Sequence, residues 1–204
     1  MLEVLTAAWT TLLRSSPWEL LAMILSIFYL VLATKENIWC WPAAFIATLI
    51  YLVMFFKGRL MLESLLQVFY LAMAVYGWHE WHHRKKDKSG RAISVWSLKR
   101  HIIVICATGT ATIVAGLIFA SYTKAALPYL DAFTTCFAIV ATFMVPWKIL
   151  ENWIYWLAID TASIYLYISR EFYLTALLFC VYIVLIIFGY CRWLSEYRSA
   201  RQHT

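Results

Sequence analysis

The sequence predicts an all-α polytopic membrane protein with seven transmembrane helices, arranged as a three-helix repeat, a linker helix and a second, parallel three-helix repeat. Two observations predict this class. Hydrophobic residues make up 64% of the 204 residues and charged residues only 14%, whereas charged residues alone make up about a quarter of a soluble domain. In addition, residues 13–81 and 125–193 carry one pattern twice, at a shift of 112 residues.

The two copies carry chemically similar residues at matched positions along their length. The matched pairs are Glu19 and Asp131, Trp41 and Trp153, Tyr70 and Tyr182, Gly77 and Gly189, and Trp81 and Trp193. Two similar bundles in a membrane can rock about a site at their shared midplane, which is the architecture of many transporters. The repeat therefore predicts a transporter.

The first repeat, residues 18–81, is expected to hold three membrane spans, since about twenty apolar residues cross the hydrocarbon core. Pro17 suits the first position of a helix. The polar stretches Lys35-Glu36-Asn37 and Lys57-Gly58-Arg59 then interrupt the apolar sequence twice. The expected spans are residues 18–33, 38–56 and 60–81.

One further span, residues 102–121, falls between the two copies and is the expected linker helix. The segment 95–100 before it is amphipathic and suited to the membrane interface. The second repeat, residues 130–193, is expected to reproduce the first, with spans at residues 130–145, 149–168 and 172–193. Because a single span separates the two triplets, both enter the membrane from the same side, so the repeats are predicted to be parallel.

Lys and Arg residues are divided unequally between the two expected membrane faces. The loop after the third span, the C-terminal tail and the other ends on that face hold twelve of the 17 Lys and Arg residues, and the opposite face holds five. The positive-inside rule then places the N-terminus outside and the C-terminus in the cytoplasm. We expect a multi-pass protein of the bacterial inner membrane without a removable signal peptide.

Several other classes of protein are disfavoured. The formal charge of +6 comes from the basic loop and tail, where anionic lipid headgroups account for it, so no nucleic-acid partner is expected. The five cysteines lack Cys-x-x-Cys spacing, which argues against a disulfide or zinc framework. His79, His82 and His83 lie without cysteines or clustered acids nearby, so no metal is expected. No catalytic or phosphate-binding motif is found, so neither an enzyme nor a cofactor is expected.

Polar side chains at membrane depth mark the expected substrate pathway, because unpaired polar groups are costly in hydrocarbon. In the sixth span, Asn152, Trp156 and Asp160 recur at intervals of four and share a helix face, with Trp153 beside them. An aromatic belt at the interface is the alternative for residues 151–153. That alternative does not account for Asp160, which lies deeper in the span.

The third and fifth spans add further candidates. Gln67 and Tyr70 share a face, although hydrogen bonding between helices explains Gln67 equally well. Thr135 belongs to a polar stripe beginning at Asp131, a weaker signal because threonines often bond to their own helix. Aromatic faces attract a flat cationic ring, and amides and a carboxylate orient its polar substituents. The expected substrate contacts are Trp41, Gln67, Tyr70, Thr135, Asn152, Trp153, Trp156 and Asp160.

These motifs resemble the signature of the PnuC-type vitamin transporters over about residues 18–193. The matching segments are Asn37-Ile38-Trp39-Cys40-Trp41-Pro42, Leu66-Gln67-Val68-Phe69-Tyr70, Tyr76-Gly77-Trp78, Asp131-Ala132-Phe133-Thr134-Thr135, and Glu151-Asn152-Trp153 with Trp156 and Asp160. The resemblance implies seven helices in a three, one, three order, similar to SWEET sugar transporters, and usually a homotrimer. It also implies facilitated diffusion of nicotinamide riboside, which is trapped by phosphorylation inside the cell.

Two departures from the family pattern leave the substrate open. Ala141-Thr142-Phe143 stands where nicotinamide riboside carriers often have Ala-Gln-Trp or Ala-Gln-Tyr, and Met61-Leu62-Glu63-Ser64 replaces a common Tyr-Ala-Asp pattern. Family members similar in these places include thiamine carriers, so thiamine is the alternative substrate. A SWEET-like sugar carrier would share the repeat but needs fewer aromatic residues. A membrane sensor or scaffold would need a longer docking segment than the residues that follow Trp193.

Overall fold

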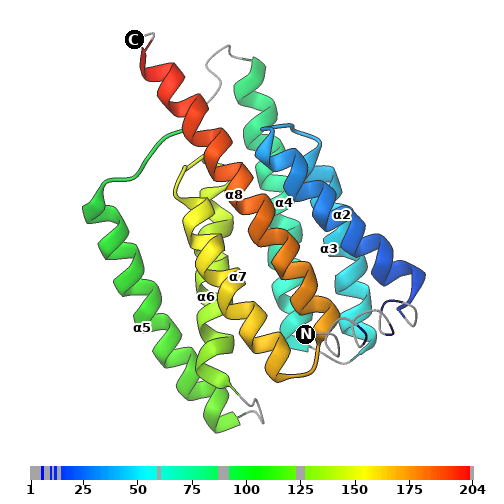
Figure 1. Ribbon diagram of the computed structural model, residues 1–204. Coiled ribbons are helices and arrows are strands. Elements are labelled where there is room, and N and C mark those ends of the chain that lie inside the picture. Colours follow the sequence, from blue (N-terminus) through cyan, green and yellow to red (C-terminus); the bar gives the residue numbers. More distant parts are fainter. Residues whose placement is uncertain are drawn as a thin grey trace.

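The structure is a computed structural model that describes residues 15–58, 61–86, 92–122 and 127–202, together with Thr6, Thr10 and Leu12. The four described ranges contain seven α-helices (Figure 1). The helices are α2 (Pro17–Thr34), α3 (Cys40–Lys57), α4 (Met61–Lys86), α5 (Leu98–Tyr122), α6 (Pro128–Met144), α7 (Asn152–Ser169) and α8 (Tyr173–Gln202). The all-helical class with seven helices is therefore confirmed.

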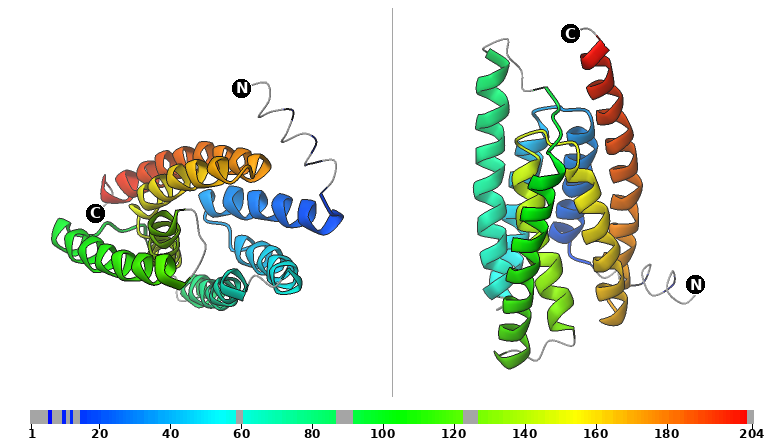
Figure 2. Two further views of the ribbon diagram at one scale, coloured as in Figure 1. Left: turned by 90° about the horizontal axis from the view of Figure 1, so that it is seen from below. Right: turned by 90° about the vertical axis from the view of Figure 1, so that its left-hand side faces the viewer.

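Six of these helices form a closed ring, and α5 lies outside it. Around the ring the order is α2, α3, α4, α6, α7 and α8, and α8 packs in turn against α2. The contact between α2 and α8 is broad, whereas the contact between α4 and α6 is small. Helix α5 packs against α6, at the edge of the bundle (Figure 2). The ring brings the helices expected to carry the site around one centre.

The outer surface of the bundle is strongly apolar. Ile24, Leu65, Ile113 and Phe188 are all more than half exposed. A soluble protein rarely exposes so much apolar side-chain surface, whereas lipid covers it at no cost. Helices α2, α3, α5 and α8 are each long and apolar enough to cross a membrane, and α6 is apolar but shorter. The chain therefore has the surface of an integral membrane protein.

Helices α4 and α7 are less apolar than the helices around them because part of their polar content faces protein and not lipid. Ser64 of α4 is buried, as are Asn152, Asp160 and Ser163 of α7. Such groups lower the mean hydropathy of a helix without exposing polarity to hydrocarbon. They also identify α7 as the helix with the largest buried polar content among the described residues.

Four helix ends differ from the expected spans by three residues or more. Helices α4 and α8 continue to Lys86 and Gln202, because polar residues end a membrane span without breaking a helix. In the extension of α8, the side chain of Arg192 bonds to Glu196 at 3.2 Å, one turn further on. Such pairs stabilise a helix that projects beyond the membrane.

The starts of α5 and α7 differ from expectation for a shared reason. Ser94 donates its N–H to the carbonyl oxygen of Lys148 at 3.0 Å, and its own carbonyl oxygen accepts from Leu150 at 2.8 Å. This parallel bridge holds residues 148–150 extended, so α7 starts at Asn152 and not at residue 149. The segment 95–100 is divided: residues 95–97 leave the bridge, and α5 starts at Leu98.

Two contacts between tryptophan and glycine recur at equivalent places. A Cβ atom added to Gly77 of α4 would lie 2.3 Å from the indole of Trp41 in α3, and one added to Gly189 of α8 would lie 2.7 Å from Trp153 in α7. Each of these indoles also packs edge-on against a second tryptophan on the same neighbouring helix, with ring centroids 5.3 Å apart. The close approach of both helix pairs depends on the missing side chain of glycine.

Candidate functional site

Asp160 is the central polar residue of α7. Its side chain is 3% exposed, and it lies eight residues from the start of the helix, about 12 Å along the axis at 1.5 Å per residue. Among the described residues, no Lys, Arg or His forms an ion pair with it. A buried carboxylate without a cation is costly in protein or lipid. The position is therefore suited to a ligand that supplies positive charge.

Tyrosines from both halves of the ring surround this carboxyl group. Tyr70 of α4 and Tyr182 of α8 each interact electrostatically with Asp160. Tyr167 of α7 interacts with both of these phenols, and so does Tyr29 of α2. Because Tyr70 and Tyr182 are related by the 112-residue shift, the two halves contribute equivalent phenols to one carboxyl group.

Two further hydroxyl groups extend the cluster toward α3. Tyr51 of α3 interacts with Tyr167 and Tyr182, and the hydroxyl of Ser26 in α2 lies within reach of Tyr51 and Tyr182. Ser26 also donates to the carbonyl oxygen of Ala22 at 2.8 Å. We call this set the tyrosine cluster; its members are Ser26, Tyr29, Tyr51, Tyr70, Tyr167 and Tyr182, from α2, α3, α4, α7 and α8.

The tyrosine cluster borders space inside the ring. Protein atoms surround the hydroxyl groups of Tyr29, Tyr70 and Tyr182, yet all three side chains keep partial exposure. Both conditions hold together when a side chain lines an internal opening. Hollows on the outer surface, beside Tyr129 at the start of α6 and beside Trp78 on α4, have apolar linings and lie away from this cluster.

Asn152 occupies the first position of α7 and is 1% exposed. Its amide nitrogen donates to the carbonyl oxygen of Ile149 at 2.6 Å. Its carbonyl oxygen has no hydrogen-bond partner in the described part of the chain. A buried acceptor left without a partner costs about 1–3 kcal/mol. This oxygen is therefore available to a ligand or a water molecule at the end of the bundle that carries the C-terminus.

The three predicted tryptophans have distinct surroundings. Trp156 lies one turn from both Asn152 and Asp160 and packs against both clusters of buried apolar side chains. Trp41 and Trp153 fill the spaces above Gly77 and Gly189, and each keeps an indole N–H without a partner among the described residues. Packing of the helix pairs accounts for these two rings, while Trp156 lies between the amide and the carboxyl group.

The remaining predicted residues are only partly connected to this cluster. Tyr70 is brought to Asp160 as expected. Gln67 and Thr135 are half-buried on α4 and α6, and no contact within the described residues joins either to Asp160. Thr134 and Thr142 bond to carbonyl oxygens of their own helix, at 3.0 Å and 2.7 Å. The weaker reading of the threonine stripe therefore holds for both of those hydroxyls.

Sequence reasoning left Ser26, Tyr29, Tyr51, Tyr167 and Tyr182 out of the expected contacts. One signal for Tyr182 was present, since the repeat superposes it on Tyr70. Ser26 and Tyr29 lie three residues apart in an otherwise apolar helix and share a face. Nothing in the spacing of residues alone shows that this face meets Asp160.

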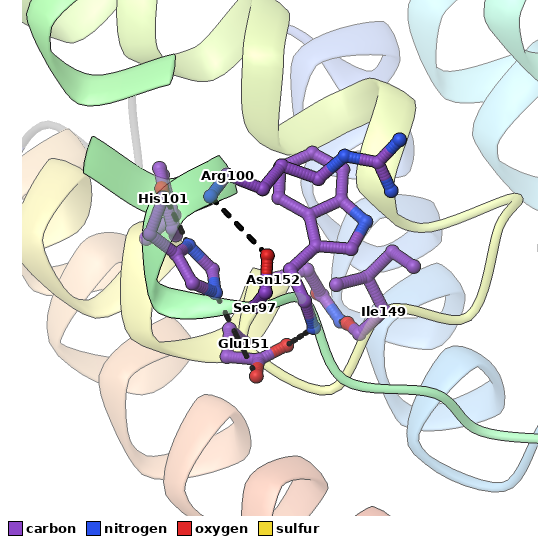
Figure 3. A network of polar contacts seen from close by, with 8 residues as sticks. Ser97, Arg100, His101, Ile149, Glu151 and Asn152 are labelled. Atoms are coloured by element: carbon purple, nitrogen blue, oxygen red, sulfur yellow. Dashed lines mark hydrogen bonds and ion pairs between the residues drawn. The ribbon is translucent and has the colours of Figure 1, made fainter. Parts of the chain in front are cut away.

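A polar network connects the linker helix to the start of α7 (Figure 3). Glu151 accepts a hydrogen bond from the backbone N–H of Trp96 at 3.3 Å and lies 3.6 Å from a ring nitrogen of His101. The other ring nitrogen of His101 lies 3.0 Å from the hydroxyl of Tyr155. Together with the bridge at Ser94, these contacts attach the segment before α5 to the residue that precedes Asn152.

Comparison with known proteins places this architecture among vitamin carriers. A family model described as "Nicotinamide mononucleotide transporter" matches residues 16–195. The riboflavin/roseoflavin transporter RibM of Streptomyces davaonensis is 25% identical over 189 residues, covering 90% of this chain and 87% of the relative. The nicotinamide riboside transporter PnuC of Escherichia coli is 22% identical over 206 residues, covering 89% and 86%.

The fold is also similar to a solved structure. A crystal structure of the vitamin B3 transporter PnuC matches with a TM-score of 0.74 at 19% identity, covering 96% of this chain and 90% of that one. At this level of identity the similarity concerns the fold. The sequence relatives carry chemically different vitamins by name, a flavin in one case and a nicotinamide riboside in the other.

Proposed function

Because the chain belongs to the nicotinamide mononucleotide transporter family, which includes the PnuC-type vitamin transporters, we propose that it imports nicotinamide riboside by facilitated diffusion. Family membership makes it an integral membrane vitamin transporter. The proposal adds the substrate and the mechanism: the vitamin equilibrates across the membrane and is trapped by phosphorylation inside the cell. Transport needs only binding and exchange, so no catalytic residue or cofactor is required.

The observation that supports this substrate is the buried Asp160 with its surrounding phenols. Nicotinamide riboside carries a positively charged pyridinium ring. A carboxylate neutralises that charge, and the faces of aromatic rings add cation–π attraction. The proposed contacts at the centre are Tyr70, Trp156 and Asp160, with the free carbonyl oxygen of Asn152 oriented toward a polar substituent. The proposed site also includes Trp41, Gln67, Thr135 and Trp153.

Thiamine is the alternative substrate, for a specific reason. Its thiazolium ring is also cationic, so the same carboxylate would serve it. Where many nicotinamide riboside carriers have an amide, Thr142 stands in this chain, and its hydroxyl bonds to the carbonyl oxygen of Ala138 at 2.7 Å. A hydroxyl already bonded to its own helix is a poor substitute for that amide. Riboflavin, named for RibM, is uncharged and gains nothing from Asp160.

We also propose that residues 18–81 and 130–193 are parallel repeats, joined by the linker at 102–121, in a SWEET-like arrangement. Helix α7 has the bounds of α3 shifted by 112 residues, and α8 starts at the position equivalent to the start of α4. The paired contacts of tryptophan with glycine support the same relation. The proposed homotrimer rests on the family resemblance, and native mass spectrometry of the detergent-solubilised protein counts its subunits.

Calorimetric titration of the purified protein tests the substrate. Nicotinamide riboside should bind most tightly, thiamine more weakly, and riboflavin without measurable heat. In vesicles without a kinase, uptake of the preferred vitamin should stop at the outside concentration and should not depend on a proton or sodium gradient. Protein-free vesicles are the control. Tightest binding of riboflavin would contradict the proposed selectivity, and accumulation above the outside concentration would contradict facilitated diffusion.

A further inference from the structure

An ion pair joins the two halves of the ring at the end of the bundle where α8 ends. Glu36 lies in the loop between α2 and α3, and Lys148 lies in the loop between α6 and α7. The ammonium group of Lys148 bonds to the carboxylate of Glu36, and the two side chains are only 17% and 18% exposed. The pair is therefore largely withdrawn from water, which strengthens its Coulomb attraction relative to a surface pair.

The two partners occupy equivalent positions of the repeat. They are 112 residues apart, the same shift that relates the paired tryptophans and glycines. Both also adopt a left-handed backbone conformation with φ of 50°, which is uncommon for residues other than glycine. Two loops of the same local shape thus meet where the axis relating the halves leaves the bundle.

Neighbouring side chains strengthen this contact from both sides. The ammonium of Lys148 lies 5.2 Å from the ring centroid of Trp81, in cation–π range. The indole N–H of Trp81 donates to the carbonyl oxygen of Pro146 at 3.1 Å, so a first-half side chain holds the second-half loop. On α8, Arg192 and Glu196 form a pair at 3.2 Å beside Glu36.

These charges keep Glu36 ionised. Burial alone would raise the pKa of Glu36, but hydrogen bonds with Glu196 and Lys148 and the positive charges of Lys148 and Arg192 outweigh it and lower that pKa. The carboxyl group is therefore charged at neutral pH and attracts Lys148 with its full charge.

The opposite end of the bundle is built differently. There Arg170, between α7 and α8, pairs with Asp131 of α6, so both partners belong to the second half. Of the ion pairs within the described residues, only Glu36–Lys148 connects the first half to the second. A movement that separates the halves at the end where α8 ends must break this pair, whereas the Arg170 pair can move as part of one half.

We propose that the Glu36–Lys148 pair is the gate that closes the transport pathway at the end of the bundle carrying the C-terminus. The proposal rests on the proposed transport function, in which the halves rock about a central site. The pair is formed while this end is closed and separates when the end opens to release or admit the vitamin. The opposite end opens without breaking it.

A reversible crosslink tests the gate. In a variant whose five native cysteines are replaced, and which still transports, Glu36→Cys and Lys148→Cys are joined with a bismaleimide that contains a cleavable disulfide. The crosslinked protein should still bind nicotinamide riboside but lose exchange in vesicles, and reduction should restore exchange. The matched control is Arg192→Cys with Glu196→Cys, joined by the same reagent within α8, which should leave exchange unchanged.

Charge reversal provides a second measurement that does not depend on the crosslink. Glu36→Lys and Lys148→Glu alone should each alter the exchange rate at retained vitamin affinity, and the double reversal should return the rate toward that of the native protein. Full exchange by the crosslinked protein would overturn the gate. Failure of the double reversal to restore the rate in a protein that still binds would do the same. A native protein that binds none of the vitamins would refute the proposed function instead.

Discussion

The proposed selectivity for a cationic vitamin depends on a single buried side chain, that of Asp160. Its carboxyl group is 3% exposed and interacts electrostatically with Tyr70 and Tyr182, one phenol from each half of the ring. Phenols orient and partly solvate a carboxylate, but they do not neutralise it. A ligand with positive charge would complete this arrangement, and a neutral ligand would leave the charge unpaired.

Replacing Asp160 by Asn keeps the size of the side chain and removes its charge. Since a hydrogen bond to a charged group is worth about 1.5–3 kcal/mol, affinity for nicotinamide riboside should fall roughly 10- to 100-fold. Affinity for an uncharged analogue of the vitamin should change much less. The same substitution at Asp131, which pairs with Arg170 at the end of the bundle, is the control and should leave both affinities unchanged. Equal losses for charged and uncharged ligands would argue against an electrostatic role.

Pairs of helices owe their close packing to the absence of one atom. Helices α3 and α4 meet where Trp41 covers Gly77, and α7 and α8 meet where Trp153 covers Gly189. Helices in lipid gain little from the hydrophobic effect when they associate, so close contact of their surfaces supplies much of the stability. A tryptophan against a glycine maximises that contact, which explains why both features recur in the two halves.

Gly77→Ala and Gly189→Ala should each destabilise the protein. The new methyl group would lie within 2.3 Å of Trp41 or 2.7 Å of Trp153, and overpacking of this kind typically costs about 1–3 kcal/mol. Gly109→Ala on α5 is the matched control, because no atom lies within 4 Å of its added methyl group. It should be neutral or slightly stabilising, since alanine favours helix by up to about 1 kcal/mol over glycine. Thermal unfolding in detergent compares the three, and equal melting temperatures would refute the packing role.

The whole molecule is proposed to be oriented with its C-terminus in the cytoplasm. Described basic residues gather at one end of the bundle, at the helix ends that share the side of the C-terminus. They are Lys35, Lys99, Arg100, Lys148, Arg192, Arg198 and Arg201. The notebook of loops on the other side contains few Lys and Arg residues, Arg170 among them. Basic loops remain on the cytoplasmic side during insertion.

Thiol labelling of intact cells tests this orientation. In a protein without native cysteines, Ser199→Cys near the end of α8 should resist a membrane-impermeant maleimide until the cells are opened. Ser169→Cys at the end of α7 is the matched control, because it is also exposed but lies at the opposite end. It should be labelled in intact cells. The reverse labelling pattern would invert the topology and would place the proposed Glu36–Lys148 gate on the outside.

The sequence by itself determined the helical class, the family and the residues at which most helices begin and end. These properties follow from runs of apolar residues long enough for a bilayer, from polar stretches between them, and from motifs in a set order. Pro17 at the start of α2 and Gly58 at the end of α3 are examples that need no tertiary information. The shift of 112 residues was likewise readable from matched residues alone.

Only the tertiary structure decided which faces of these helices meet. In a soluble protein the apolar face of a helix is the buried one, but in a membrane both the lipid face and the packed face are apolar, so periodicity does not distinguish them. For this reason the sequence did not reveal that Ser26 and Tyr29 approach Tyr182, or that Trp41 and Trp153 pack against glycine. The Glu36–Lys148 pair, formed between loops 112 residues apart, depends on the assembly of both halves.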